Sequence, residues 1–159
     1  MVGKVPKDVE KRALVTLYKY LPSRSEQVAG ARAFGIPPNP FEDTDISTVL
    51  IEDATKIKTT NWGPRLPVRK ALIADFKTGL CKKHVVFFAN ALCLGWTKAL
   101  ADEMVTAILE GGGGIYIHDL QKLYLKGDDM QEVWKDWQRE LTRVTQEDYR
   151  KRRKDKQSK

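Results

Sequence analysis

The strongest constraint on the fold comes from one continuous stretch in the second half of the chain. An apolar run at 84–89 predicts a buried strand, and residues 98–110 have the apolar spacing of a helix. Gly111 to Gly114 then form a turn, and a second short apolar run follows at 115–118. A strand, a crossover helix and a second strand make one βαβ unit, in which the two strands are parallel.

The loop between the first of these strands and the helix is where such a unit usually binds its ligand or carries its chemistry. Here the loop contains Leu92-Cys93-Leu94-Gly95-Trp96-Thr97, in which no side chain is charged. Acid–base and phosphoryl chemistry both require charged groups, so the sequence argues against them at this loop. Cys93 has no cation close to it in the sequence before Lys98, which favours an inert thiol over a reactive one.

The remaining segments continue the alternation of strands and helices. Strands are predicted at 13–18 and 48–51, helices at 26–33 and 67–78, and one long amphipathic helix at 130–153. The predicted fold is an α/β sandwich of three layers with a mostly parallel central sheet, followed by the long C-terminal helix. The expected organisation is a flexible N-terminus at 1–11, an α/β domain at 12–129, the helix at 130–153 and a disordered basic tail at 154–159.

Composition is that of an ordinary globular domain, with 159 residues of which 42% are hydrophobic and 31% are charged. No apolar run is long enough to cross a bilayer and the first residues are too polar for a secretory signal, so we expect a cytoplasmic protein. Two cysteines, Cys81 and Cys93, suit a reducing compartment. His84 and His118 stand without a cysteine or carboxylate cluster at metal-ligand spacing, so we expect neither a metal nor a cofactor.

The positive charge is concentrated at the C-terminus. Residues 150–159 contain seven basic residues and one acid, which is a net charge of +6 out of +7 for the whole chain. Such a cluster predicts an arm for nucleic acid or another polyanion, and a solvated, disordered tail is the alternative. The candidate nucleic-acid-binding residues are Arg150, Lys151, Arg152, Arg153, Lys154 and Lys156.

Three segments together resemble the catalytic domain of the serine recombinases, the resolvase/invertase family. The segment from Arg65-Leu66-Pro67 to Gly79 is similar to that family's Arg-Pro-x-x-x-x-Leu…Gly helix. Leu92 to Thr97 falls where the family has Asp-Arg-Leu-Gly-Arg-Ser, and 99–119 resembles the helix, glycine turn and strand that follow. The resemblance spans about residues 12–150 and implies a resolvase-like form of the α/β fold.

The resemblance also implies where catalytic groups would stand, and most of them are absent. The family cleaves DNA with a serine at the end of the first strand and a cage of arginines around the scissile phosphate. Arg65 keeps its family identity, and Lys19 takes the place of another arginine. The changed positions are Leu21 at the nucleophile (Tyr20 after a shift of one residue), Leu92 at the aspartate, and Cys93 and Trp96 at two arginines. The resemblance therefore implies a degenerate member that does not cleave strands.

From this we expect a non-catalytic protein of a phage or mobile element that binds DNA and associates with itself, in a regulatory or architectural role. The predicted interface is the helix face that carries Trp134, Trp137 and Leu141, because the corresponding family helix makes the dimer contact and leads toward DNA. Core packing is the alternative for the two rings.

Two other functions stay open on the sequence alone. The first is an active recombinase with a displaced nucleophile, Ser23 or Ser25, that uses Lys19, Arg65 and Arg69. The second is a structural component of a larger assembly, in which the basic tail contacts RNA or an acidic protein.

Overall fold

The computed structural model describes residues 11–18, 20–34, 49–54, 59–60, 63–64, 66–79 and 84–157. Among the residues that the sequence singles out, Lys19, Arg65 and Cys81 lie outside this part of the chain, as do 1–10 of the expected N-terminus. Lys11, which the sequence assigns to a flexible N-terminus, is instead the first residue of a strand.

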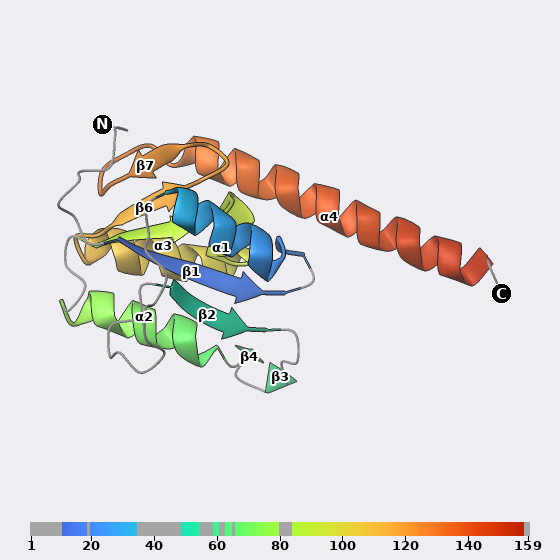
Figure 1. The fold of residues 1–159 in the computed structure, drawn as a ribbon, viewed down its shortest axis with the longest axis horizontal. Helices are drawn as coiled ribbons and strands as arrows, with labels where there is room; N and C mark the ends of the chain where they lie inside the picture. The colour runs from blue at the N-terminus through green and yellow to red at the C-terminus, as the bar shows by residue number, and fades with distance from the viewer. Residues whose placement is uncertain are drawn as a thin grey trace.

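Five strands form one sheet in the order β2-β1-β5-β6-β7 (Figure 1). Their bounds are Lys11–Leu17 (β1), Val49–Asp53 (β2), Val85–Phe88 (β5), Gly114–Ile117 (β6) and Lys122–Tyr124 (β7). The first four strands are parallel, and β7 alone runs antiparallel to its neighbour. A separate pair of short antiparallel strands, β3 and β4, comprises Thr59–Thr60 and Gly63–Pro64. The predicted α/β class and mostly parallel sheet are therefore confirmed.

Helices cover both faces of this sheet and create two cores of unequal size. Their bounds are Arg24–Ala33 (α1), Pro67–Lys77 (α2), Lys98–Glu110 (α3) and Gln131–Gln157 (α4), with a 3₁₀ turn at Ala91–Leu94 (η1). Side chains alternate between the faces along each strand. Leu14 and Val86 therefore point into the main core with α2 and α3, whereas Ala13 and Phe87 pack in a smaller cluster with α1 on the opposite face.

Local sequence explains where several of these helices begin. Ser23 accepts a hydrogen bond from the Glu26 amide at the start of α1, and Thr97 does the same for the Leu100 amide at the start of α3. Pro67 occupies the first turn of α2, where a missing N–H has no cost. The sequence did not predict β7, because three residues are too few to show an alternating pattern.

The long helix α4 begins against the body and then extends well beyond it (Figure 1). The sequence predicts that this helix ends at Arg153 and that 154–159 are disordered, but α4 continues to Gln157, so the prediction is wrong for 154–157. No glycine or proline interrupts the helix, and basic residues are favoured near a helix C-terminus because they complement its dipole. Among the described residues, no helix combines the length and the apolar character needed to cross a membrane.

Candidate functional site

The candidate site lies at the carboxyl ends of β1 and β5, which are parallel neighbours in the sheet. From β1 the chain passes through α1 to β2 on one side, and from β5 it passes through α3 to β6 on the other side. Such a reversal of direction is the place where α/β sheets usually bind ligands. The segments after β1 and after β5 therefore form the candidate site.

Three aromatic side chains occupy this place. The rings of Tyr18 and Trp96 are stacked, with their centroids 4.2 Å apart and 15° between their planes. Tyr20 meets Tyr18 edge to face at 5.5 Å. All three side chains are partly exposed. We call Tyr18, Tyr20 and Trp96 the aromatic cluster; it joins the loop after β5 to the segment after β1.

The uncharged side-chain amide of Gln27 links β1 to η1 by hydrogen bonds. The buried Gln27 donates from Nε2 to the carbonyl oxygens of Thr16 and Pro22, both at 2.8 Å. Its Oε1 accepts from the Thr16 amide at 3.3 Å and from the Cys93 thiol at 3.9 Å. Burial raises the pKa of Cys93 to about 12, so the side chain is a neutral thiol near pH 7 and not a nucleophile.

The loop after β5 is held between α3 and α4. A Cβ at Gly95 would lie 2.5 Å from the Ala101 amide nitrogen and 2.7 Å from backbone of Leu100, so only glycine allows this close approach. The Gly95 carbonyl oxygen accepts from Nε1 of Trp137 at 2.7 Å. Leu92 of the same loop is fully buried and contributes packing to the main core.

Arg69 supports the same loop from α2. It is only 3% exposed, and its Nη2 donates to the carbonyl oxygens of Leu94 and Leu100, the latter at 2.6 Å. Its backbone amide donates to Glu52 Oε1 at 3.0 Å. Burial lowers the pKa of Arg69 to about 10, so the guanidinium stays charged at neutral pH. This contradicts the role of Arg69 in the recombinase alternative, because the group binds backbone carbonyls and is not presented to a phosphate.

Ser23 and Ser25, the two candidate nucleophiles of that alternative, both belong to the start of α1. The Ser23 hydroxyl caps α1 through the Glu26 amide at 3.2 Å and has a structural partner, and Ser25 lies within α1. Leu21, which the resemblance to the recombinases would align with a nucleophile, is half-buried and packs against the main core. The described part of the site therefore has neither a positioned nucleophile nor a group of arginines that faces it.

The two tryptophans of α4 lie in different surroundings. Trp137 is 6% exposed and belongs to the main core, so the prediction that it forms an interface with a second chain is wrong. Trp134 is half-buried, meets Trp137 edge to face at 6.4 Å, and has Lys98 Nζ 3.5 Å from its ring centroid. Leu141 is also partly buried against the core. Of the three residues of the predicted interface, only Trp134 and Leu141 have side chains exposed enough to contact a partner.

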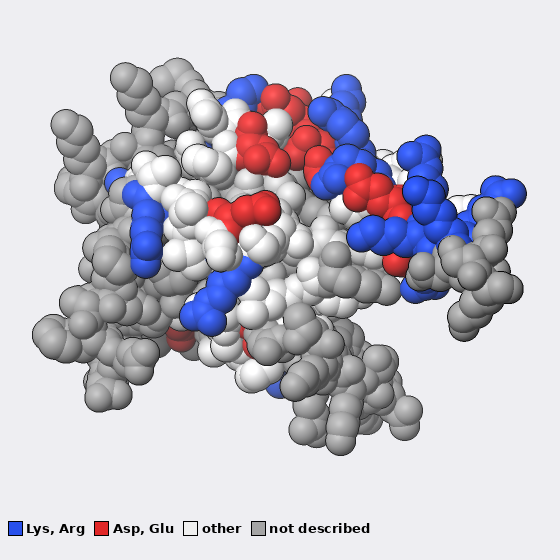
Figure 2. All heavy atoms as spheres, turned by 45° about the vertical axis from the view of Figure 1, so that its right-hand side comes forward, with Lys and Arg blue, Asp and Glu red and all other residues white. Residues whose placement is uncertain are grey.

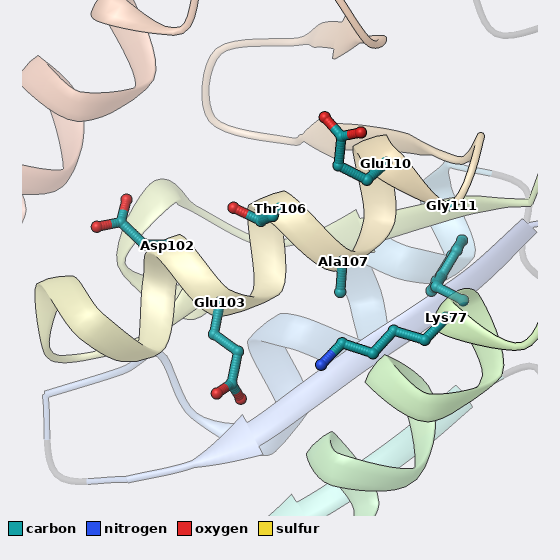
Figure 3. A pocket seen from close by; sticks show the side chains of 8 residues that line it. Lys77, Asp102, Glu103, Thr106, Ala107, Glu110 and Gly111 are labelled. Atoms are coloured by element: carbon teal, nitrogen blue, oxygen red, sulfur yellow. The ribbon is translucent and has the colours of Figure 1, made fainter.

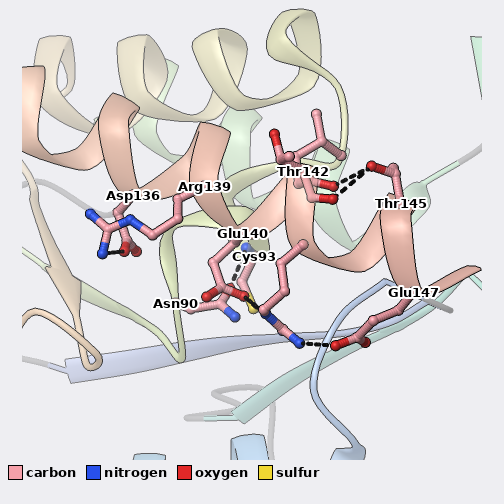
Figure 4. A network of polar contacts seen from close by, with 10 residues as sticks. Asn90, Cys93, Asp136, Arg139, Glu140, Thr142, Thr145 and Glu147 are labelled. Atoms are coloured by element: carbon pink, nitrogen blue, oxygen red, sulfur yellow. Dashed lines mark hydrogen bonds and ion pairs between the residues drawn. The ribbon is translucent and has the colours of Figure 1, made fainter.

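Charge along α4 changes sign from its base to its end. The first half carries Asp136 and Glu140, with Arg143 bridging Glu140 at 2.8 Å and Glu147 at 3.0 Å (Figure 4). The last turns carry five consecutive basic residues, Arg150 to Lys154, whose side chains are all exposed. Figure 2 shows basic side chains gathered over this outer part of the helix. The side chain of Lys156 lies outside the described residues.

A hollow of about 470 Å³ lies elsewhere, between α2 and α3 (Figure 3). Its lining includes Asp102, which pairs with Lys98 at 2.7 Å, and Glu110, which pairs with Lys126 at 3.1 Å. These ion pairs neutralise most of the acidic charge of the hollow. It is separate from the switch point and has no group that suggests chemistry.

The sequence pattern marks Trp96 only as a departure from the recombinase motif and does not predict its stack on Tyr18. Nor does it predict the hydrogen bonds of Gln27 or the structural role of Arg69. The sequence does place two tyrosines after the first strand and a tryptophan after the strand at 85–88. Only the parallel pairing of β1 with β5 brings these side chains together.

Within the described ranges, no three histidine, cysteine or acidic side chains are placed to hold a metal ion. The site consists of an aromatic cluster, a neutral amide, a buried thiol and a loop that is fixed by hydrogen bonds. Comparisons with protein-family models, with curated proteins and with solved structures give no significant match to this chain.

Proposed function

We propose that this chain is a resolvase-like protein that binds DNA without cleaving it, through the outer end of α4. The observation that carries the proposal is the run of exposed basic side chains at 150–154 on a helix that extends away from the α/β body. Successive residues on a helix are 1.5 Å apart along the axis, so this run concentrates five positive charges within one and a half turns. That density suits the phosphate backbone of DNA.

Most cations nearer the base of α4 are engaged within the protein. Arg143 pairs with Glu140 and Glu147, and Arg139 lies 3.8 Å from Asp136. By contrast, Arg150 and Arg153 form no ion pair with any residue in the described part of the chain. Their charge is therefore available to an external polyanion.

The site at the switch point supports binding without cleavage. Phosphodiester cleavage needs a nucleophile and groups that stabilise the developing charge. Ser23 is occupied as a helix cap and Arg69 is committed to backbone carbonyls. We therefore expect the purified protein to leave a supercoiled plasmid intact and to form no covalent adduct with DNA. A covalent adduct that disappears in Ser23→Ala would establish the recombinase alternative instead.

A salt titration tests the DNA-binding proposal directly. Duplex DNA of mixed sequence is titrated by fluorescence anisotropy from about 50 to about 200 mM salt. Each phosphate contact adds about −0.9 to the slope of log affinity against log salt. The double variant Arg150→Gln/Arg153→Gln should therefore bind more weakly and lose about 1.8 of that slope. Base preference should not change, because phosphate contacts carry no sequence information.

The matched control is Lys70→Gln/Lys77→Gln, which removes the same charge from exposed positions on α2. It should leave the slope unchanged. Equal effects of the two double variants would show that binding depends on net charge and not on α4. If the full chain binds neither duplex nor single-stranded DNA, the proposal fails, and a role as a structural component that contacts RNA or an acidic protein takes its place.

Self-association is the second part of the proposal. Trp134 and Leu141 keep part of their surface, and both lie on the base of α4. Light scattering on the full chain should give a mass above that of one chain. Trp134→Ser/Leu141→Ser should reduce that mass while the circular dichroism spectrum is retained. A monomeric wild-type protein would remove self-association from the proposal but not DNA binding.

A further inference from the structure

A continuous series of contacts joins the aromatic cluster to the basic end of α4. Trp96 stacks on Tyr18, and Tyr18 meets Tyr20 edge to face. The Tyr20 hydroxyl then donates to Asp148 Oδ2 at 3.3 Å, and the same oxygen pairs with Arg152 Nη2 at 3.2 Å. Aromatic faces at the switch point and cations on the helix therefore belong to one surface.

We propose that this surface binds unpaired DNA, with one or more bases stacked on the Tyr18 and Trp96 rings and the phosphates following α4. The inference rests on the proposed DNA-binding function and specifies its substrate class. Proteins that bind single strands without sequence preference combine these two features, a basic track for the backbone and aromatic rings for the bases. A fully paired duplex keeps its bases stacked inside, so it offers the phosphates but not the base faces.

The position of Trp96 also favours this substrate. The Gly95 carbonyl is held by Trp137, and Gly95 packs directly on the first turn of α3, so the ring that follows is presented from a fixed loop. Trp96 and its stacking partner Tyr18 remain partly exposed, although the neighbouring Leu92, Cys93 and Leu94 are fully buried. A ring that only filled the core would be buried with these neighbours.

The chain offers a matched control for a stacked aromatic pair. Phe34 and Tyr116 stack with centroids 4.1 Å apart and 15° between planes, which is nearly the geometry of Tyr18 and Trp96. This second pair packs with Phe87 in the cluster on the α1 face of the sheet. Loss of one ring from either pair should have similar effects on packing, but only the first pair should affect single-strand binding.

The experiment compares oligo-dT with a duplex of equal length, using the full chain and anisotropy at one salt concentration. Trp96→Leu should weaken oligo-dT binding about tenfold, the loss expected for one stacked base. Its duplex affinity should stay within about twofold of the wild type. Trp96→Phe keeps an aromatic face and should restore most of the oligo-dT affinity, and Tyr116→Leu should bind both probes like the wild type.

The possible outcomes separate this inference from the proposed function. If duplex DNA binds but Trp96→Leu leaves oligo-dT affinity unchanged, the aromatic cluster is only packing and the inference is wrong, while the proposed function stands. If neither probe binds, the proposed function itself fails. Should Trp96→Leu not fold, Trp96→Phe still decides: quenching of tryptophan fluorescence by oligo-dT must decrease in that variant, and unchanged quenching overturns the inference.

Discussion

The replacement Trp137→Phe tests whether α4 is attached to the body through the loop after β5. Trp137 is 6% exposed, and its Nε1 donates to the Gly95 carbonyl oxygen at 2.7 Å. Phenylalanine keeps an aromatic ring but removes this donor and part of the buried volume. The carbonyl of Gly95, a buried residue, is then left without this partner.

The expected loss of stability is the sum of two effects, the lost hydrogen-bond donor and the lost buried volume. A buried polar group that loses its partner costs about 1–3 kcal/mol. Full truncation of a buried tryptophan costs about 3–5 kcal/mol, and the change to phenylalanine is expected to contribute about 1 kcal/mol of that range. Together, Trp137→Phe should lower the free energy of unfolding by about 2–4 kcal/mol. That is a large share of the roughly 5–15 kcal/mol typical of whole domains.

The neighbouring Trp134→Phe is the matched control. Trp134 is half-buried, and its main specific contact is Lys98 Nζ over the ring at 3.5 Å. Phenylalanine keeps much of that contact, so we expect a loss below about 1 kcal/mol. Urea unfolding followed by circular dichroism measures both variants. If Trp137→Phe unfolds like the wild type and instead reduces the oligomer mass in light scattering, Trp137 belongs to an interface and the assignment to the core is wrong.

Three further predictions concern the same region. Gly95→Ala should lower the free energy of unfolding by about 2 kcal/mol or more, measured by urea unfolding, because its Cβ would meet backbone atoms of α3 at 2.5–2.7 Å. In a Cys81→Ser background, Cys93 should not react with a thiol reagent at pH 7 until the protein is unfolded, because burial raises its pKa to about 12; rapid labelling of the folded protein would contradict this. Burial raises the pKa of Asp136 above its ordinary value, so its favourable contribution is present at low pH and is lost as pH rises through the raised pKa. Asp136→Asn should therefore be at least as stable as the wild type at pH 7, and its advantage should shrink near pH 4; a large loss at pH 7 would refute this.

The elements that the sequence predicts well are those with a strong local pattern. Residues 98–110 show helical spacing, begin after a threonine cap and end at a glycine, and the structure has α3 at these residues. The strands before and after it are apolar and follow the expected parallel order. The end of α4 was missed because a run of basic residues resembles a disordered tail, whereas basic side chains also favour a helix C-terminus.

Residue roles at the site were harder to predict, because they depend on distant partners. Trp134 and Trp137 share a face in the sequence pattern, yet only the docking of α4 on η1 buries one and leaves the other half-exposed. The recombinase alternative assigns Arg69 to phosphate binding. The structure has it bind backbone carbonyls 25 and 31 residues away, and no residue near Arg69 in the sequence indicates those partners. Long-range contacts of this kind leave no local signal.

The loop after β5 is held in place by hydrogen bonds from two other elements, α2 and α4. Leu94 and Gly95 both make structural contacts: the Leu94 carbonyl accepts from Arg69 and the Gly95 carbonyl accepts from Trp137. Leu92 and Cys93 of the same loop are buried in the main core. The loop therefore holds the base of α4, because Trp137 of that helix donates to the Gly95 carbonyl and packs in the main core. In the proposed DNA-binding mode, this attachment fixes where the basic side chains of α4 lie relative to the aromatic cluster, to which Tyr20 and Asp148 connect them.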